Sequence, residues 1–112
     1  MKLYISGPMS RMLDNNFPAF NEAESLLRAA GYDTENPAEK GEIPGWDWDD
    51  YLRYDIIKLM ECQGVANLPL PSPDWISEGR ELENYIAGKL PSMTILTVEE
   101  WLVRAELQVA FA

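Results

Sequence analysis

The chain has 112 residues, so we expect a single domain over residues 1–112 with one hydrophobic core. Hydrophobic residues make up 46% of the sequence and charged residues 25%, which is an ordinary globular composition. Nine basic and nineteen acidic residues give a formal net charge of -10. Because this charge repels the phosphates of DNA and RNA, we do not expect a polymeric nucleic acid as a partner.

Apolar periodicity and break signals predict alternating strands and helices along the chain. The predicted strands cover residues 2–6, 32–36, 64–68 and 94–97. The predicted helices cover residues 17–30, 47–62, 77–89 and 98–111, and residues 38–45 are expected to form a loop. This order predicts an α/β fold with a parallel sheet, right-handed crossovers and helices on both faces.

The cysteine and histidine content limits the chemistry available to this chain. Cys62 is the only cysteine, which excludes an intrachain disulfide, and there is no histidine for a Cys/His zinc cluster or a Ser/His/Asp triad. Acid–base chemistry therefore falls to carboxylates. The N-terminus lacks a signal-peptide pattern, and no segment approaches the ~18 consecutive apolar residues of a membrane span. We expect a cytoplasmic protein with no membrane partner.

In a parallel α/β sheet the ligand lies outside the carboxyl ends of the strands, where the strand order reverses. In the flavodoxin-like order this point lies between the first and third strands, which directs attention to residues 7–16 and 69–83. There is no GxGxxG and no Walker lysine pattern in the sequence, so dinucleotide-binding and P-loop interpretations lack support.

Two carboxylates fall on the apolar sides of predicted helices. The apolar stripe of the helix over 47–62 comprises Trp48, Tyr51, Leu52, Ile56 and Leu59, and that of the next helix comprises Leu82, Tyr85, Ile86 and Leu90. Asp55 lies within the first stripe, and Glu83 lies at the edge of the second, beside Gly79. Burial raises the pKa of a carboxyl group, which suits a nucleophile or an acid–base group. The alternative is a hydrogen-bonded acid at the end of a core stripe.

The loop Gly7-Pro8-Met9-Ser10-Arg11 offers backbone N–H groups, a hydroxyl and a guanidinium. Ser77 and Gly79 open a helix whose N-terminal dipole favours an anion, so the two segments can hold one phosphate. The alternative is an ordinary turn and an ordinary N-cap. Trp46 and Trp75 flank the expected cleft, where their rings can stack a planar base, whereas Trp48 and Trp101 fit core or interface stripes.

Several motifs together resemble the nucleoside 2-deoxyribosyltransferase-like superfamily, and most of all its small phage and bacterial members. These motifs are Tyr4-Ile5-Ser6-Gly7-Pro8-Met9-Ser10, Asp14-Asn15-Asn16-Phe17-Pro18-Ala19-Phe20, Asn36-Pro37-Ala38-Glu39, Tyr51-Leu52-Arg53-Tyr54-Asp55 and Ser77-x-Gly79-x-x-x-Glu83. The resemblance implies a flavodoxin-like (Rossmann-like) three-layer sandwich with a four- to five-stranded parallel sheet.

The resemblance also implies cleavage of the N-glycosidic bond of (deoxy)nucleosides or their 5'-monophosphates through a covalent sugar ester on a glutamate. Glu83 matches that nucleophile, Asp55 matches the aspartate that assists departure of the base, and Tyr4 matches the tyrosine that positions the glutamate. The residues matched to the 5'-phosphate site are Gly7, Pro8, Met9, Ser10, Arg11, Ser77 and Gly79. A carboxylate nucleophile needs no metal or other cofactor.

The chain departs from many relatives at Gln63, which stands where they carry an acid, and at Arg80, which stands where they carry a small residue. Arg80 can strengthen phosphate binding. We therefore expect a 2'-deoxynucleoside 5'-monophosphate N-glycosidase acting on a small-molecule nucleotide. The alternatives are a deoxyribosyltransferase, disfavoured because the chain ends at Ala112 without a longer C-terminal segment, a non-catalytic nucleotide-binding or sequestering protein, and a plain interaction module.

Relatives in the superfamily form homodimers or larger assemblies. The last predicted helix carries more apolar side chains than one buried face requires. They are Val98, Trp101, Leu102, Val103, Ala105, Leu107, Val109 and Phe111. We therefore expect at least a homodimer.

Overall fold

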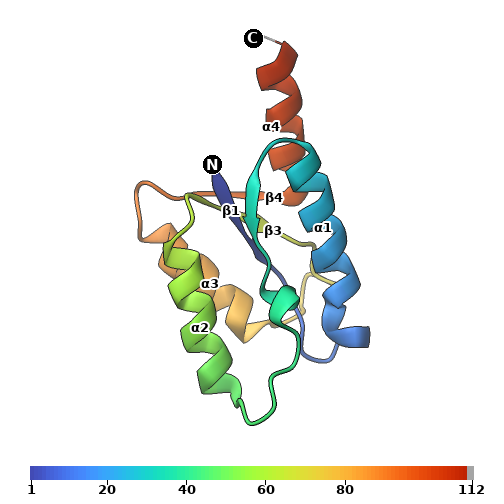
Figure 1. The fold of residues 1–112 in the computed structure, drawn as a ribbon, viewed down its shortest axis with the longest axis vertical. Helices are drawn as coiled ribbons and strands as arrows, with labels where there is room; N and C mark the ends of the chain where they lie inside the picture. The colour runs from blue at the N-terminus through green and yellow to red at the C-terminus, as the bar shows by residue number, and fades with distance from the viewer. Residues whose placement is uncertain (111–112) are drawn as a thin grey trace.

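A computed structural model describes residues 1–110 and has a four-stranded, all-parallel sheet with the strand order β2-β1-β3-β4 (Figure 1). The strands are β1 (Lys2–Ser6), β2 (Asp33–Glu35), β3 (Gly64–Asn67) and β4 (Thr94–Thr97). The α-helices are α1 (Phe17–Ala29), α2 (Trp48–Met60), α3 (Glu78–Gly88) and α4 (Val98–Ala110). The predicted α/β, flavodoxin-like architecture is confirmed, with four strands.

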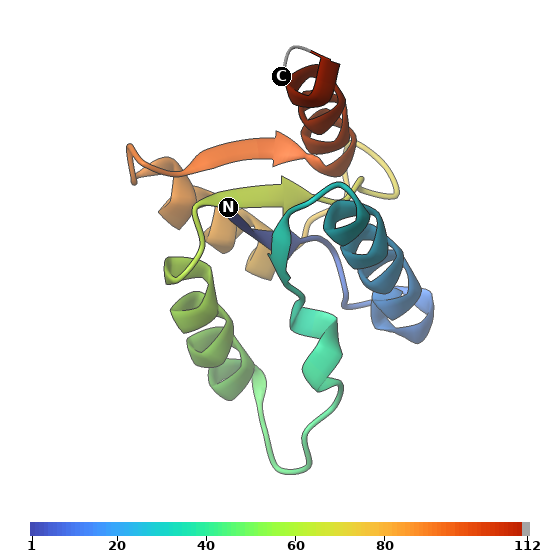
Figure 2. The same ribbon diagram turned by 45° about the horizontal axis from the view of Figure 1, so that its top comes forward.

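The helices cover both faces of the sheet and make three layers (Figures 1 and 2). Alternate residues of β1 point to opposite faces. Leu3 and Ile5 pack in a cluster with Phe20 and Leu27 of α1 and with Trp101 of α4. The other face holds a smaller cluster of Tyr4, Leu59, Cys62, Val65 and Ala87, which joins the sheet to α2 and α3.

The close packing of α4 on the sheet depends on a glycine in β3. Trp101 is fully buried, and its indole Nε1 donates a hydrogen bond to the Val65 carbonyl at 2.8 Å. A Cβ atom at Gly64 would lie 2.7 Å from the Trp101 ring and 2.8 Å from a Leu3 methyl group. Only glycine fits here without displacing the tryptophan.

Two short 3-10 helices follow the carboxyl ends of β1 and β2, namely η1 (Leu13–Asn16) and η2 (Pro37–Lys40). The expectation of a loop over residues 38–45 was therefore wrong for residues 38–40, which belong to η2. The side chain of Asn36 accepts a hydrogen bond from the Ala38 N–H at 2.9 Å, and Pro37 follows it, which is a helix start signal. Gly41, at φ 61°, ends the turn.

Two aromatic side chains expected on apolar stripes lie outside the core. Trp48 is 57% exposed and Tyr85 is 64% exposed. Trp48 is the first residue of α2 and lies at the end of that helix that extends beyond the sheet, whereas Trp101 is buried as expected. A helical wheel assigns a direction to each side chain, but it does not say how far along the helix the sheet provides cover.

The second half of α4 projects beyond the other elements (Figures 1 and 2). Its apolar residues Val103, Leu107 and Val109 are all more than half exposed. Phe111, which was expected to belong to this helix, lies outside the described residues. Within residues 1–110, no helix is both long enough and apolar enough to cross a membrane.

Candidate functional site

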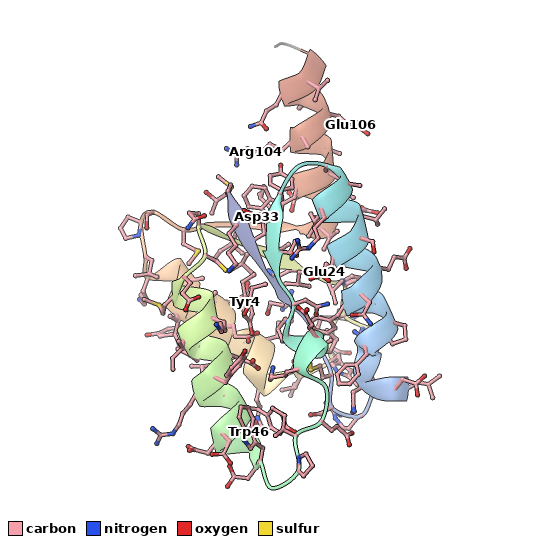
Figure 3. The ribbon with its side chains drawn as sticks, viewed as in Figure 1. Tyr4, Glu24, Asp33, Trp46, Arg104 and Glu106 are labelled. Atoms are coloured by element: carbon pink, nitrogen blue, oxygen red, sulfur yellow. The ribbon has the colours of Figure 1, made fainter. Side chains whose placement is uncertain are left out.

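The carboxyl ends of the strands lead into a cleft of about 940 Å³. Four segments line it: the loop after β1, η1 with the start of α1, the stretch from η2 into α2, and α3 with the residues just before it. The structure has a second, smaller cavity, and the cleft is called the larger cavity below. Both inward carboxylates predicted from the sequence, Asp55 and Glu83, line the larger cavity. Figure 3 shows Tyr4 on β1 in the middle of the molecule and Trp46 in the loop before α2.

Glu83 is the most enclosed acid of the site, with 7% of its surface exposed. The hydroxyl of Tyr4 donates a short hydrogen bond to Oε2, and the hydroxyl of Ser6 donates one to Oε1 at 2.7 Å. Tyr4 and Ser6 are two residues apart on β1, so both side chains point to the α3 face of the sheet. The strand thereby fixes both carboxylate oxygens.

Burial raises the pKa of Glu83 to about 7, although the hydrogen bonds from Tyr4 and Ser6 act in the opposite direction. Burial and the neighbouring Glu83 charge raise the pKa of Tyr4 well above its ordinary value, so Tyr4 stays a proton donor to the carboxylate. Glu83 therefore changes its charge close to neutral pH.

A pair of asparagines holds α3 against β3 beside this acid. The amide of Asn67 donates to Asn84 Oδ1 at 2.7 Å, and the amide of Asn84 donates back to Asn67 Oδ1 at 3.0 Å. Asn84 Nδ2 also donates to the Arg80 carbonyl at 2.8 Å. Because Asn84 follows Glu83 in the sequence, this network fixes the position of Glu83 relative to β3.

Asp55 is held by a residue that the sequence did not single out. Lys40 Nζ lies 2.6 Å from Asp55 Oδ1, and both side chains are largely buried. Burial raises the pKa of Asp55, and the hydrogen bond and charge of Lys40 partly offset that effect. No local pattern signals this contact, because Lys40 is in the η2 turn and Asp55 is in the middle of α2.

Arg11 lines the cavity together with the start of α3. Its guanidinium donates to the Ile76 carbonyl at 2.7 Å and lies 4.5 Å from the centre of the Trp75 ring. Its backbone has φ 66°, a left-handed conformation that is unfavourable for a residue with a side chain. The two contacts stabilise this conformation and direct the guanidinium towards α3.

The start of α3 leaves polar groups available to a ligand. Ser77 is the N-cap residue, but its hydroxyl makes no capping hydrogen bond. Arg80 Nε is buried and has no hydrogen-bond partner among the described residues. Both side chains line the larger cavity, as does Gly79. An anion at this helix end would receive N–H groups and the favourable end of the helix dipole.

The structure brings together most of the residues predicted to contact a phosphate. Gly7, Met9, Ser10, Arg11, Ser77 and Gly79 all line the larger cavity. Pro8 does not, because its side chain is fully buried, and its carbonyl instead accepts a hydrogen bond from Asn16 at 2.9 Å. Tyr4 reaches the site through its hydroxyl under Glu83.

Aromatic rings border the cavity on the α2 side. Trp46 lines it and makes an edge contact with Tyr51, with ring centroids 5.1 Å apart. Trp48, expected on a core or interface stripe, also lines the cavity. Trp75 packs against Arg11 and is not among the lining residues, so of the three tryptophans near the cavity only Trp46 and Trp48 can stack a planar ligand.

Other reactive groups are engaged elsewhere. Cys62 is buried, and burial raises the pKa of its thiol to about 11. The close acidic group Asp47, Asp49 and Asp50 offers oxygen ligands of the kind hard cations prefer. Asp47 and Asp50 cap the start of α2 reciprocally, and Asp49 pairs with Arg53 at 2.7 Å, so the fold already uses these oxygens.

The family model described as "Domain of unknown function (DUF4406)" matches residues 1–97, and the chain belongs to this family. Comparison with curated proteins and with solved structures found no significant match to this chain.

Proposed function

We propose that this member of the DUF4406 family is an N-glycosidase that hydrolyses (deoxy)nucleoside 5'-monophosphates through a covalent ester between the sugar and Glu83. The observation that carries the proposal is the placement of Glu83. It is an enclosed carboxylate at the side of a large cavity, and two hydroxyl groups from β1 hold its oxygens. The resemblance to the nucleoside 2-deoxyribosyltransferase-like superfamily points to the same residue.

The proposed reaction has two steps. In the first, a carboxylate oxygen of Glu83 bonds to C1' of the sugar while the bond from C1' to the base nitrogen breaks, and the base leaves with the bonding electrons and takes up a proton. Asp55 assists this departure. In the second step, water attacks C1' and gives up a proton to the solvent while the ester bond breaks, which releases the sugar phosphate and the Glu83 carboxylate and balances the proton taken up by the base. Tyr4 and Ser6 orient the carboxylate throughout.

The part of the cavity formed by Arg11 and the start of α3 supports the proposal of a 5'-phosphate on the substrate. Arg11, Arg80, the hydroxyl of Ser77 and the N–H groups at the start of α3 offer hydrogen-bond donors and two positive charges there, beside the carboxylate of Glu78. Arginine guanidinium groups and helix N-termini both suit phosphate oxygens. The rings of Trp46 and Trp48 then offer a surface for the base.

The direct test is to incubate the protein with each deoxy- and ribonucleoside 5'-monophosphate and each free nucleoside, and to measure released base by chromatography. We expect release from a monophosphate and at least a 1000-fold loss of rate in Glu83→Gln and Glu83→Ala, because the nucleophile is absent. The matched control is Glu81→Gln, an exposed acid of the same helix, which should retain the rate.

The outcomes of this test separate the candidate functions. Transfer of the sugar to an added second base would identify a deoxyribosyltransferase. A monophosphate that raises the melting temperature without releasing base would identify a nucleotide-binding protein. If the protein neither releases base nor binds a monophosphate, the assignment of the pocket is wrong.

We further propose that the protein is a cytoplasmic homodimer or higher homo-oligomer that acts on free nucleotides. The support for self-association is the projecting part of α4, where the exposed Val103 and Leu107 lie one helical turn apart. The net charge of -10 favours a small nucleotide over a polymeric nucleic acid as the substrate.

A further inference from the structure

Lys40 has an unusual position for a lysine, because its charged end lies inside the protein. Its side chain is 13% exposed, and that of its partner Asp55 is 17% exposed. Nζ donates to Asp55 Oδ1 at 2.6 Å and to the Pro37 carbonyl at 2.8 Å. A buried ammonium group with so little water requires such partners, and here both are supplied by the fold.

Elements from two parts of the chain fix the direction of this side chain. The η2 turn, capped by Asn36, determines where Lys40 leaves the backbone. Two rings of α2 then flank the ammonium group, with Nζ 5.8 Å from the centre of Tyr51 and 5.2 Å from that of Tyr54. Lys40 therefore has a defined orientation rather than the mobility of a surface lysine.

The Lys40–Asp55 pair lies between two cavities. The larger cavity contains Glu83, and a smaller one of about 310 Å³ lies on the other side. Pro37, Lys40 and Asp55 line both. The other titratable or charged groups that line these cavities with the pair are Tyr4, Arg11, Glu35, Glu39, Glu42, Tyr51, Tyr54, Lys58, Glu78, Arg80 and Glu83.

The charge of Lys40 acts on both carboxylates of the proposed site. Asp55 and Glu83 share one cavity, and the negative charge of Asp55 raises the pKa of Glu83. Lys40 lowers the pKa of Asp55 through a hydrogen bond and its charge, and it lowers that of Glu83 through its charge alone. Without Lys40, two carboxylates would face each other with less compensation.

We propose that Lys40 is a positioning residue of the site: it holds Asp55 by Oδ1, so that Oδ2 is turned to the substrate, and it places a positive charge in the cavity that the two carboxylates share. The catalytic part of this inference rests on the proposed function, because the roles of the two acids belong to the proposed reaction. The electrostatic part concerns the protein without substrate. The two parts can therefore be tested separately.

The first measurement uses the substrate-free protein with ¹³C-labelled Asp and Glu side chains and follows the carboxyl signals by NMR as the pH changes. In Lys40→Met we expect the titration midpoint of Asp55 to rise by about 1 pH unit or more, and that of Glu83 to rise by a smaller amount. Lys40→Arg should return both midpoints towards those of the wild type, because the charge is restored.

The matched control is Lys58→Met. Lys58 lines the smaller cavity and lies 5.5 Å from the centre of the Tyr54 ring, but its salt bridge is with Glu61 and not with Asp55. This variant removes the same charge from the same region. We expect it to leave the midpoints of Asp55 and Glu83 much closer to the wild-type values.

The second measurement is the pH profile of base release. Lys40→Met should lower kcat at least tenfold with little change in KM. The acid side of its kcat/KM profile should move to higher pH. Lys40→Arg should recover most of the rate. A purely structural lysine would change the amount of folded protein but not the profile. If the wild type releases no base, the proposed function fails, and the NMR titration still decides the electrostatic role.

Unchanged midpoints in Lys40→Met would overturn the proposal. If this variant does not fold, Lys40→Gln provides a second neutral side chain that can still donate to Pro37 and Asp55. Failure of both neutral variants to fold would also overturn it, because Lys40 would then be required for folding and not for positioning.

Discussion

At the scale of single residues, the site is governed by one carboxyl group in an environment that favours its proton. Glu83 has a pKa of about 7 because burial disfavours its charge more strongly than Tyr4 and Ser6 favour it. In the unfolded chain the same group titrates near 4.5. Between these values the folded protein holds a proton that the unfolded chain has lost, so folding becomes less favourable as the pH rises.

This difference predicts a specific pH dependence of stability. Below about pH 4.5 both states are protonated and the group has no effect, whereas above about pH 7 the cost is complete, on the order of 3 kcal/mol. In Glu83→Gln, which cannot ionise, this cost is absent. We therefore expect the free energy of unfolding of the variant, relative to that of the wild type, to rise by most of this amount between pH 5 and pH 8, as measured by urea unfolding. A difference that stays constant between the two pH values would contradict the burial of an ionisable Glu83.

At the scale of elements, the starts of α2 and α3 differ in how their free N–H groups are satisfied. In α2 the side chain of Asp47 accepts from the Asp50 N–H at 3.1 Å, and the side chain of Asp50 accepts from the Asp47 N–H at 3.0 Å. In α3 the hydroxyl of Ser77 makes no such bond. The first start is a structural cap, whereas the second lacks a side-chain cap, and in the proposed function its donors serve a ligand.

We expect the two caps to respond differently to alanine. Asp47→Ala should cost about 1 kcal/mol of stability, because it removes a capping box, and it should leave nucleotide binding largely intact. Ser77→Ala should cost at most a few tenths of a kcal/mol but weaken monophosphate binding severalfold. Urea unfolding and calorimetric titration with a monophosphate would measure both effects. A large stability loss in Ser77→Ala would show that its hydroxyl serves the helix after all.

The sequence predicts the strands, the α-helices and the inward direction of Asp55 and Glu83 well, because each depends on the period of apolar residues along one element. Ser6 could have been identified in the same way, since it shares a strand face with Tyr4. Lys40 could not, because its partner comes from another element. Trp48 and Tyr85 were misplaced because a helix period does not show where neighbouring elements end.

At the scale of the whole molecule, the second half of α4 projects beyond the other elements and leaves apolar side chains uncovered. Figure 3 shows Arg104 and Glu106 on this projecting part. Val103 and Leu107 are one helical turn apart and each is 53% exposed. A second copy of α4 would cover them, and two chains of charge -10 would repel each other over the rest of their surfaces.

Sedimentation at micromolar concentration should therefore find a dimer that is strengthened by added salt, which screens the repulsion. Leu107→Glu should convert it to a monomer, because two carboxylates would then enter the apolar contact. Leu13→Glu is the matched control, since Leu13 is 88% exposed on η1 and should have no effect. A wild-type monomer under these conditions would contradict the proposed self-association.

The enclosed Glu83 also makes ligand binding a reaction that exchanges protons with the solution. A phosphate-bearing ligand adds negative charge to the cavity and should draw a proton onto Glu83 near pH 7, so the heat of binding should change with the ionisation enthalpy of the buffer. The sequence has no histidine, the side chain that ordinarily buffers this pH range. Because a phosphate monoester also titrates in this range, calorimetry in two buffers should be compared between the wild type and Glu83→Gln, and the difference counts the protons taken up at this carboxyl group.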